Sequence, residues 1–139
     1  MKAFTDIEQS KKLAEILPIE SADMHYIRRT HDFMGNPVDR KWSYPEYGNP
    51  NSKHAGYIVQ NFESYEKIPC WSLAALINAL PISIKFKDDE YYLRFMKEYV
   101  EYANDEISLT GRYLHTTGND NLVDACVEMI EKLHELNFL

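Results

Sequence analysis

The sequence predicts an α+β protein: an antiparallel sheet of about four or five strands with three helices packed mainly on one face. Two kinds of periodicity lead to this prediction. Apolar residues recur at helical spacing in three segments, near the start, in the middle and at the end of the chain. Between the second and third segments, apolar and polar residues alternate with a period of two, as in the strands of a meander. Grouped strands flanked by helices are typical of an α+β fold.

The first predicted helix covers residues 6–17. Thr5 and Glu8 match a capping box, in which two side chains accept hydrogen bonds from backbone N–H groups at the helix start. Pro18 then ends the helix, because proline lacks the N–H group that a further turn needs. The apolar residues of this segment are Ile7, Leu13, Ala14, Ile16 and Leu17.

A strand is expected at residues 23–29. Side chains alternate across a strand, so Met24, Tyr26 and Arg28 point to one face. His25, Ile27 and Arg29 then point to the other face. A second short strand is expected at 57–65.

The longest uncharged stretch of the chain contains residues 68–81, which predict a buried central helix. Either Ser72 is its N-cap or Pro69 occupies its first turn. Apolar residues then recur at helical spacing at Trp71, Leu73, Leu76, Ile77 and Leu80.

After Pro81 the period changes to two, which predicts a meander of three or four antiparallel strands. Ile82, Ile84 and Phe86 alternate with polar residues up to a turn at 88–89. The chain returns over 91–97, and two more strands are expected at 99–102 and 107–114, parted by a turn near residues 104–105. A single helix over 89–103 is the competing interpretation.

The last helix is predicted from the apolar stripe that follows residues 119–121, each of which is a favourable N-cap. Asp124 falls in the first turn, where a negative charge suits the helix dipole. Asn137 is expected to end the helix in the left-handed conformation. The stripe consists of Leu122, Cys126, Met129, Ile130, Leu133 and Leu136.

The length of 139 residues predicts a single domain, 1–139, with a long irregular loop at about 31–56. The net charge of −7 argues against nucleic-acid binding and against binding to anionic membranes. The charge is uneven. Residues 1–87 carry 11 basic and 10 acidic side chains, net +1, and residues 88–139 carry 4 basic and 12 acidic, net −8.

A cytoplasmic location is expected. Six charged residues within 1–17 exclude the apolar core of a signal peptide, and 68–81 is too short to span a bilayer. Cys70 and Cys126 fall in apolar patterns, which favours free buried thiols in a reducing compartment, with a disulfide as the alternative.

The segment 31–56 is the predicted binding surface. It holds three glycines, three prolines and two copies of Gly-Asn-Pro, so turns replace regular structure there. Aromatic and amide side chains form adaptable contact surfaces at low entropic cost. The alternative is that these rings fold back onto the core. The candidate binding residues, which extend just past this segment, are Trp42, Tyr44, Tyr47, His54 and Tyr57.

Cys70 and Trp71 together resemble the nucleophile region of papain-like cysteine peptidases, where a helix start lowers the pKa of the thiol. The residues before the cysteine depart from that family's pattern. His115 could serve as the partner histidine, with Asn119 to orient it, but nothing in the spacing requires this pairing. The five histidines are scattered without metal-ligand spacing, and no phosphate-binding loop occurs. The sequence therefore predicts no catalytic constellation, no metal site and no cofactor.

Two blocks, 68–81 and 121–139, together with 4–17 and 21–24 ahead of them, resemble a group of short uncharacterised proteins from gut bacteria and their phages or prophages. The resemblance implies a shared fold and a bacterial or phage cytoplasmic setting, and it implies no activity.

Three functional hypotheses follow. The first is a small non-enzymatic binding or accessory protein that recognises a protein partner through the aromatic loop. The second is an acidic inhibitor that mimics nucleic acid and occupies a host DNA-binding protein. The third is a hydrolase that depends on Cys70.

Overall fold

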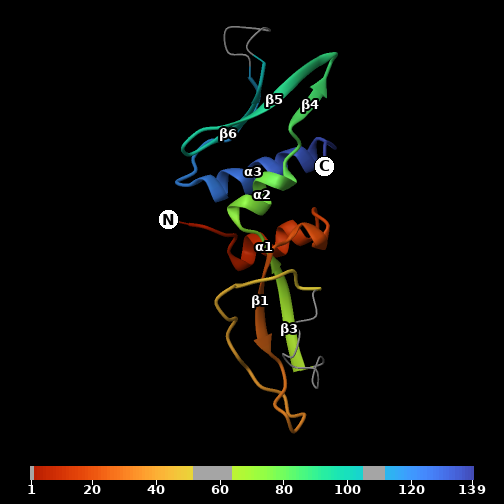
Figure 1. Cartoon of the computed structure of the whole chain (residues 1–139), viewed down its shortest axis with the longest axis vertical. Coiled ribbons are helices and arrows are strands. Elements are labelled where there is room, and N and C mark those ends of the chain that lie inside the picture. Colours follow the sequence, from red (N-terminus) through yellow and green to blue (C-terminus); the bar gives the residue numbers. More distant parts are fainter. Residues whose placement is uncertain (1, 52–63, 105–111) are drawn as a thin grey trace.

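The computed structural model describes residues 2–51, 64–104 and 112–139. In these residues three helices lie between two antiparallel sheets along the longest axis of the molecule (Figure 1). The α+β prediction is confirmed, but the strands divide into sheets of three and four strands instead of forming one sheet. In chain order the elements are α1 (Ile7–Ala14), η1 (Ile19–Ser21), β1 (Met24–Arg29), β2 (Glu46–Tyr47), β3 (Tyr65–Cys70), α2 (Leu73–Ala79), β4 (Ser83–Phe86), β5 (Asp89–Phe95), β6 (Val100–Ala103), β7 (Arg112–His115) and α3 (Leu122–Glu135).

The three-stranded sheet has the order β2-β1-β3. The strand predicted at 23–29 is confirmed as β1. Of the strand predicted at 57–65 only residues 64 and 65 are described; Tyr65 is the first residue of β3, which continues to Cys70, and residues 57–63 lie outside the described residues. β3 pairs with all six residues of β1, and Pro69 is accommodated because this strand lies at the end of the strand order.

The central helix begins later than the uncharged stretch predicts. Residues 68–70 belong to β3, so α2 covers only Leu73–Ala79. Ser72 is its N-cap, and its hydroxyl accepts a hydrogen bond from Ala75 N at 3.2 Å. Of the two predicted starts, the one with Ser72 is therefore confirmed.

The four-stranded sheet has the order β4-β5-β6-β7 and is the predicted meander. The competing helix over 89–103 is wrong, since these residues form β5 and β6. Lys87 and Asp88 have φ angles of 51° and 70°, the left-handed values that a tight two-residue hairpin requires. Residues 107–111 of the last predicted strand lie outside the described residues.

The helix ends follow local hydrogen bonding. α1 is capped by Asp6 with Gln9, one residue later than the predicted capping box of Thr5 and Glu8. Thr5 is fully buried and accepts a hydrogen bond from Trp71 N at 3.1 Å, so its side chain is not available as a cap. α3 has the predicted cap, Asn121, and Asn137 follows it at a φ of 63°.

The buried apolar residues form two clusters. The larger one joins the three helices to the four-stranded sheet, with α2 and β6 packed against α3. The smaller one lies between α1 and the three-stranded sheet and consists of Met24, Tyr26, Ile68 and Cys70. The sheet that carries the predicted binding loop therefore has the smaller core.

Candidate functional site

One face of the three-stranded sheet carries most of the predicted binding residues. Met24, Tyr26 and Arg28 lie directly opposite Cys70, Ile68 and Glu66 in the register of β1 and β3, so these side chains share a face. Tyr47 lies opposite Met24 on the other side of β1 and shares that face too. We call the surface formed by Phe4, Arg28, Trp42, Tyr44 and Tyr47 the aromatic face.

The backbone of residues 43–49 is tied to the body of the protein. Ser43 N donates to Ile27 O at 2.9 Å, and Gly48 N donates to Asp23 O at 2.8 Å. The Nδ2 atom of Asn49 donates to Ile19 O at 2.7 Å. These bonds hold both ends of the segment, so its side chains extend from a fixed backbone.

The side chain of His25 also contacts this segment. It is fully buried, and its Nδ1 atom lies 2.8 Å from Gly48 O. Its Nε2 atom lies 3.6 Å from a carboxylate oxygen of Glu46 on β2. A buried side chain thus contacts the residues on both sides of Tyr47, which fixes the backbone position from which the Tyr47 ring extends.

Trp42 has a partly structural role. Its ring is half-buried against the smaller apolar cluster, and the guanidinium of Arg28 lies 4.5 Å from its centroid. Arg28 in turn forms an ion pair with Glu66 at 2.7 Å. This arrangement supports the alternative prediction for Trp42, that the ring folds back onto the core.

Tyr44 and Tyr47 present their rings to solvent, with 78% and 79% of their surface exposed. Tyr44 makes an edge-to-face contact with Phe4, at a centroid distance of 5.4 Å and an angle of 89°. Rigid aromatic rings with a polar tip, held on a fixed backbone, suit recognition of another molecule.

The structure brings together three of the five predicted binding residues, Trp42, Tyr44 and Tyr47. The other two, His54 and Tyr57, lie outside the described residues. Sequence reasoning missed Phe4 and Arg28. The alternation of β1 already placed Arg28 and His25 on different faces of the strand. No sequence signal connects Phe4 to Tyr44.

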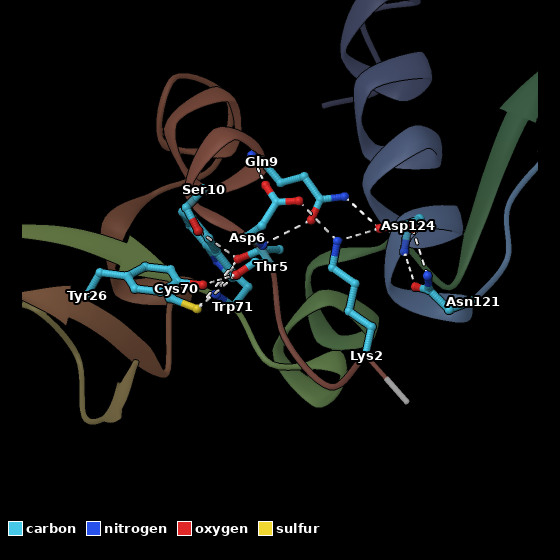
Figure 2. A network of polar contacts seen from close by, with 10 residues as sticks. All are labelled: Lys2, Thr5, Asp6, Gln9, Ser10, Tyr26, Cys70, Trp71, Asn121 and Asp124. Carbon is cyan, nitrogen blue, oxygen red and sulfur yellow. Dashed lines mark hydrogen bonds and ion pairs between the residues drawn. The ribbon is translucent and has the colours of Figure 1, made fainter. Parts of the chain in front are cut away.

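Cys70 lacks the surroundings that the hydrolase hypothesis requires. Its side chain is fully buried in β3, and its Sγ atom contacts Thr5 Oγ1 at 3.6 Å and Thr5 O at 3.5 Å. Burial raises the pKa of the thiol, against the direction that a nucleophile needs. The Tyr26 hydroxyl also donates to Thr5 O, at 2.7 Å, so Cys70 belongs to a buried polar cluster around Thr5 (Figure 2).

The same network continues to the last helix (Figure 2). Lys2 Nζ and Gln9 Nε2 donate to Asp124 Oδ1 at 2.7 and 2.8 Å. Asn121 Nδ2 donates to the other carboxylate oxygen, also at 2.7 Å. Burial raises the pKa of Asp124, but the hydrogen bonds from these three side chains outweigh it and leave the pKa lowered. These hydrogen bonds connect α1 to the first turn of α3, where Asp124 lies.

Several acidic residues of 88–139 also have internal partners. Glu101 is buried, with Arg94 at 3.2 Å. Glu90 accepts a hydrogen bond from Ser83 at 2.7 Å, and Glu128 lies 3.8 Å from Lys132. Carboxylates that serve the fold are less suited to imitate a row of exposed phosphates, which weakens the basis of the nucleic-acid mimic hypothesis.

Within residues 2–51, 64–104 and 112–139, no group of three or more His, Cys, Asp or Glu side chains is arranged to hold a metal ion. None of the helices in these ranges has the length and apolar character needed to cross a membrane. Comparisons of the chain with protein-family models, curated proteins and solved structures gave no match.

Proposed function

We propose that the protein is a small binding protein of bacterial or phage origin, with no catalytic activity of its own, that acts in the cytoplasm and recognises a protein partner through its aromatic face. The observation that supports this proposal is the exposure of Tyr44 and Tyr47 on a backbone held by hydrogen bonds at both ends. The free, buried state of Cys70 and Cys126 fits a reducing compartment.

The energetics of interfaces favour this use of the tyrosines. Tyr and Trp are enriched among the residues that contribute most to protein–protein binding, because they bury a large area for few rotatable bonds. The fixed backbone of 43–49 lowers the ordering cost further, since the segment is already held before a partner arrives. Arg28 adds a cation beside the rings, and Arg is enriched at interfaces as well.

The test is a double variant, Tyr44→Ser with Tyr47→Ser, compared with the wild-type chain by capture from bacterial lysate. Both rings are exposed, so the free energy of unfolding of the variant should stay within about 0.5 kcal/mol of the wild-type value. Any protein captured by the wild type is then purified, and its affinity is measured by calorimetry. We expect the double variant to bind at least about tenfold more weakly.

Tyr92→Ser is the matched control, because Tyr92 is an exposed tyrosine on the four-stranded sheet. This variant should keep wild-type affinity. A partner that binds the Tyr44/Tyr47 double variant as tightly as the wild type would show that the aromatic face is not the binding surface. Trp42 is unsuitable for this test, since its half-buried ring also packs on the core.

A further inference from the structure

The chain beyond β1 forms a tight hairpin that ends in a hydrogen-bonded turn. Val38 N donates to Thr30 O and Asp32 N donates to Asn36 O, both at 2.9 Å. Between these rungs, residues 31 and 37 form an isolated bridge. The chain therefore reverses direction over residues 32–36, which we call the hairpin tip.

Asp32 organises the hairpin tip. Its Oδ1 atom accepts hydrogen bonds from Met34 N and Asn36 N, both at 2.9 Å. Gly35 N donates to Asp32 O at 3.0 Å, and Gly35 has a φ of 84°, which side-chain-bearing residues rarely adopt. The carboxylate of Asp32 is thus used inside the turn, and the turn conformation is specified by its own residues.

The two side chains at the top of this turn are large and apolar. Phe33 is 78% exposed and Met34 is 73% exposed. Neither belongs to an apolar cluster of the described residues, so neither stabilises the fold by burial. The hydrogen bonds of Asp32 hold the turn without help from these side chains, which are therefore available to contact another molecule.

The charge around the hairpin tip is opposite to that of the whole molecule. Residues 28–41 hold four basic and two acidic side chains, net +2, whereas the chain carries −7. Glu66 of β3 forms an ion pair with Arg28, which leaves a local excess of +1. Arg40 and Lys41, which follow the hairpin in the chain, are both exposed. One of the two acidic side chains, Asp32, is the one that accepts the hydrogen bonds of the turn.

The shape of the molecule separates the hairpin tip from the acidic side chains of α3. The hairpin tip lies at one end of the longest axis, and the four-stranded sheet lies at the other end, beyond the helices (Figure 1). The six residues of β1 alone span about 20 Å. That length exceeds the screening distance of about 8 Å at physiological ionic strength. The acidic side chains of α3 therefore do not oppose an anionic surface that meets the tip.

We propose that the hairpin tip docks on an anionic lipid membrane, with Phe33 and Met34 inserted at the interface and Arg40 and Lys41 at the headgroups. Membrane attachment of a peripheral protein needs two weak signals, and an apolar insertion beside a group of cations supplies both. Anionic lipids give the cytoplasmic leaflet a negative surface potential, which suits a cytoplasmic protein. The expectation of no membrane binding came from the net charge of the whole chain and does not consider this local excess of cations.

The experiment measures co-sedimentation of the full chain with vesicles of phosphatidylcholine, with and without phosphatidylglycerol. We expect binding only to the mixed vesicles, and less of it as salt is added. Replacing both apolar residues, Phe33→Ser with Met34→Ser, should weaken the partition about tenfold or more. Arg40→Gln with Lys41→Gln should weaken it as well and reduce its salt dependence.

The matched control is Ile82→Ser, which removes an 83% exposed apolar side chain just before β4, away from the three-stranded sheet. It should bind the mixed vesicles like the wild type. Circular dichroism checks that each variant is folded. The proposal is overturned if the wild type does not bind the mixed vesicles, if the double serine variant still binds, or if Ile82→Ser loses binding equally. The Tyr44/Tyr47 double variant should still bind vesicles, so this test and the partner test can fail separately.

Discussion

At the scale of single residues, short polar side chains decide how the segments of this protein meet. The Thr5 hydroxyl lies 2.8 Å from the Ser10 hydroxyl and also accepts the Trp71 N–H group. Two overlapping patterns, Thr5 with Glu8 and Asp6 with Gln9, could both cap α1. Asp6 is the cap because Thr5 is needed where α1 meets the junction of β3 and α2.

Asp124 provides the clearest pH prediction at this scale. Its pKa is lowered in the folded protein, so its charge contributes stability above the unfolded pKa of about 3.8, and this contribution is lost as the pH falls through the folded value. We expect Asp124→Asn to lower the free energy of unfolding by about 1 kcal/mol at pH 7. The cost is small because 31% of the side chain is exposed to water. Urea unfolding from pH 7 to pH 3 should show this difference shrink below about pH 4.

Asp120→Asn is the matched control for this measurement. Asp120 is exposed just before α3, so its replacement should change the free energy of unfolding by less than about 0.5 kcal/mol. A difference between the wild type and Asp124→Asn that stays constant down to pH 3 would mean that hydrogen-bond geometry, and not the charge, is responsible.

At the scale of elements, α2 shows how packing compensates for a short helix. An isolated helix of seven residues is unstable in water, so α2 depends on its contacts with α3. Leu76 is fully buried in the larger cluster. We expect Leu76→Ala to lower the free energy of unfolding by about 2–5 kcal/mol, as measured by urea unfolding.

Asn78→Ala on the same helix is the comparison, because Asn78 is exposed. That substitution should change stability by less than about 0.5 kcal/mol. If Leu76→Ala cost less than about 1 kcal/mol, α2 would not be a central packing element.

The elements that periodicity predicts well are those whose pattern has one interpretation. The amphipathic stripe of α3 is confirmed up to Leu133, and the alternation is confirmed over 83–86, because each shows one clear period. Leu136 and Ile82 lie just outside these elements and are exposed. The uncharged stretch 68–81 has no such contrast, and it contains the end of a strand followed by a helix. Pairing with β1, which lies some forty residues away in the chain, decides where the strand ends, and no local pattern carries that information.

The candidate site was predictable to a similar extent. An excess of aromatic residues in a segment without periodicity indicated a surface, and Tyr44 and Tyr47 are exposed as that indication requires. Trp42 is half-buried because its ring packs on Arg28 and on the smaller cluster. These contacts join distant parts of the chain, so no local pattern predicts them. In the sequence, the hairpin tip shows only an ordinary turn signal. That Phe33 and Met34 are exposed there depends on how the strands are placed, which the sequence pattern does not give.

At the scale of the whole molecule, the two sheets differ in how much apolar surface supports them. Among the described residues, the larger cluster holds 17 buried apolar residues and the smaller one holds four. Regions with few buried contacts open more often than the rest of a protein. We therefore expect amides of β1 and β3 to exchange hydrogen faster than those of β6 and α3.

Native-state hydrogen exchange followed by mass spectrometry measures this difference directly. Peptides from the two regions of the same sample serve as each other's control. Equal protection of β1 and α3 would show that the molecule opens only as one unit. Faster exchange in β1 and β3 would place the aromatic face and the hairpin tip on the less stable part of the fold, where binding of a partner can add protection.

The contact between Lys2 and Asp124 also has a consequence for synthesis on the ribosome. The two residues are 122 positions apart in the chain, and the bond between them is 2.7 Å long. While the chain is being made, the first helix has to wait until residue 124 has been added before its final neighbour exists. Until then, Leu13 and Leu17 have no complete core to enter, although both are buried in the finished fold. Long-range contacts of this kind slow folding, so these apolar side chains stay exposed longer while the chain is being made.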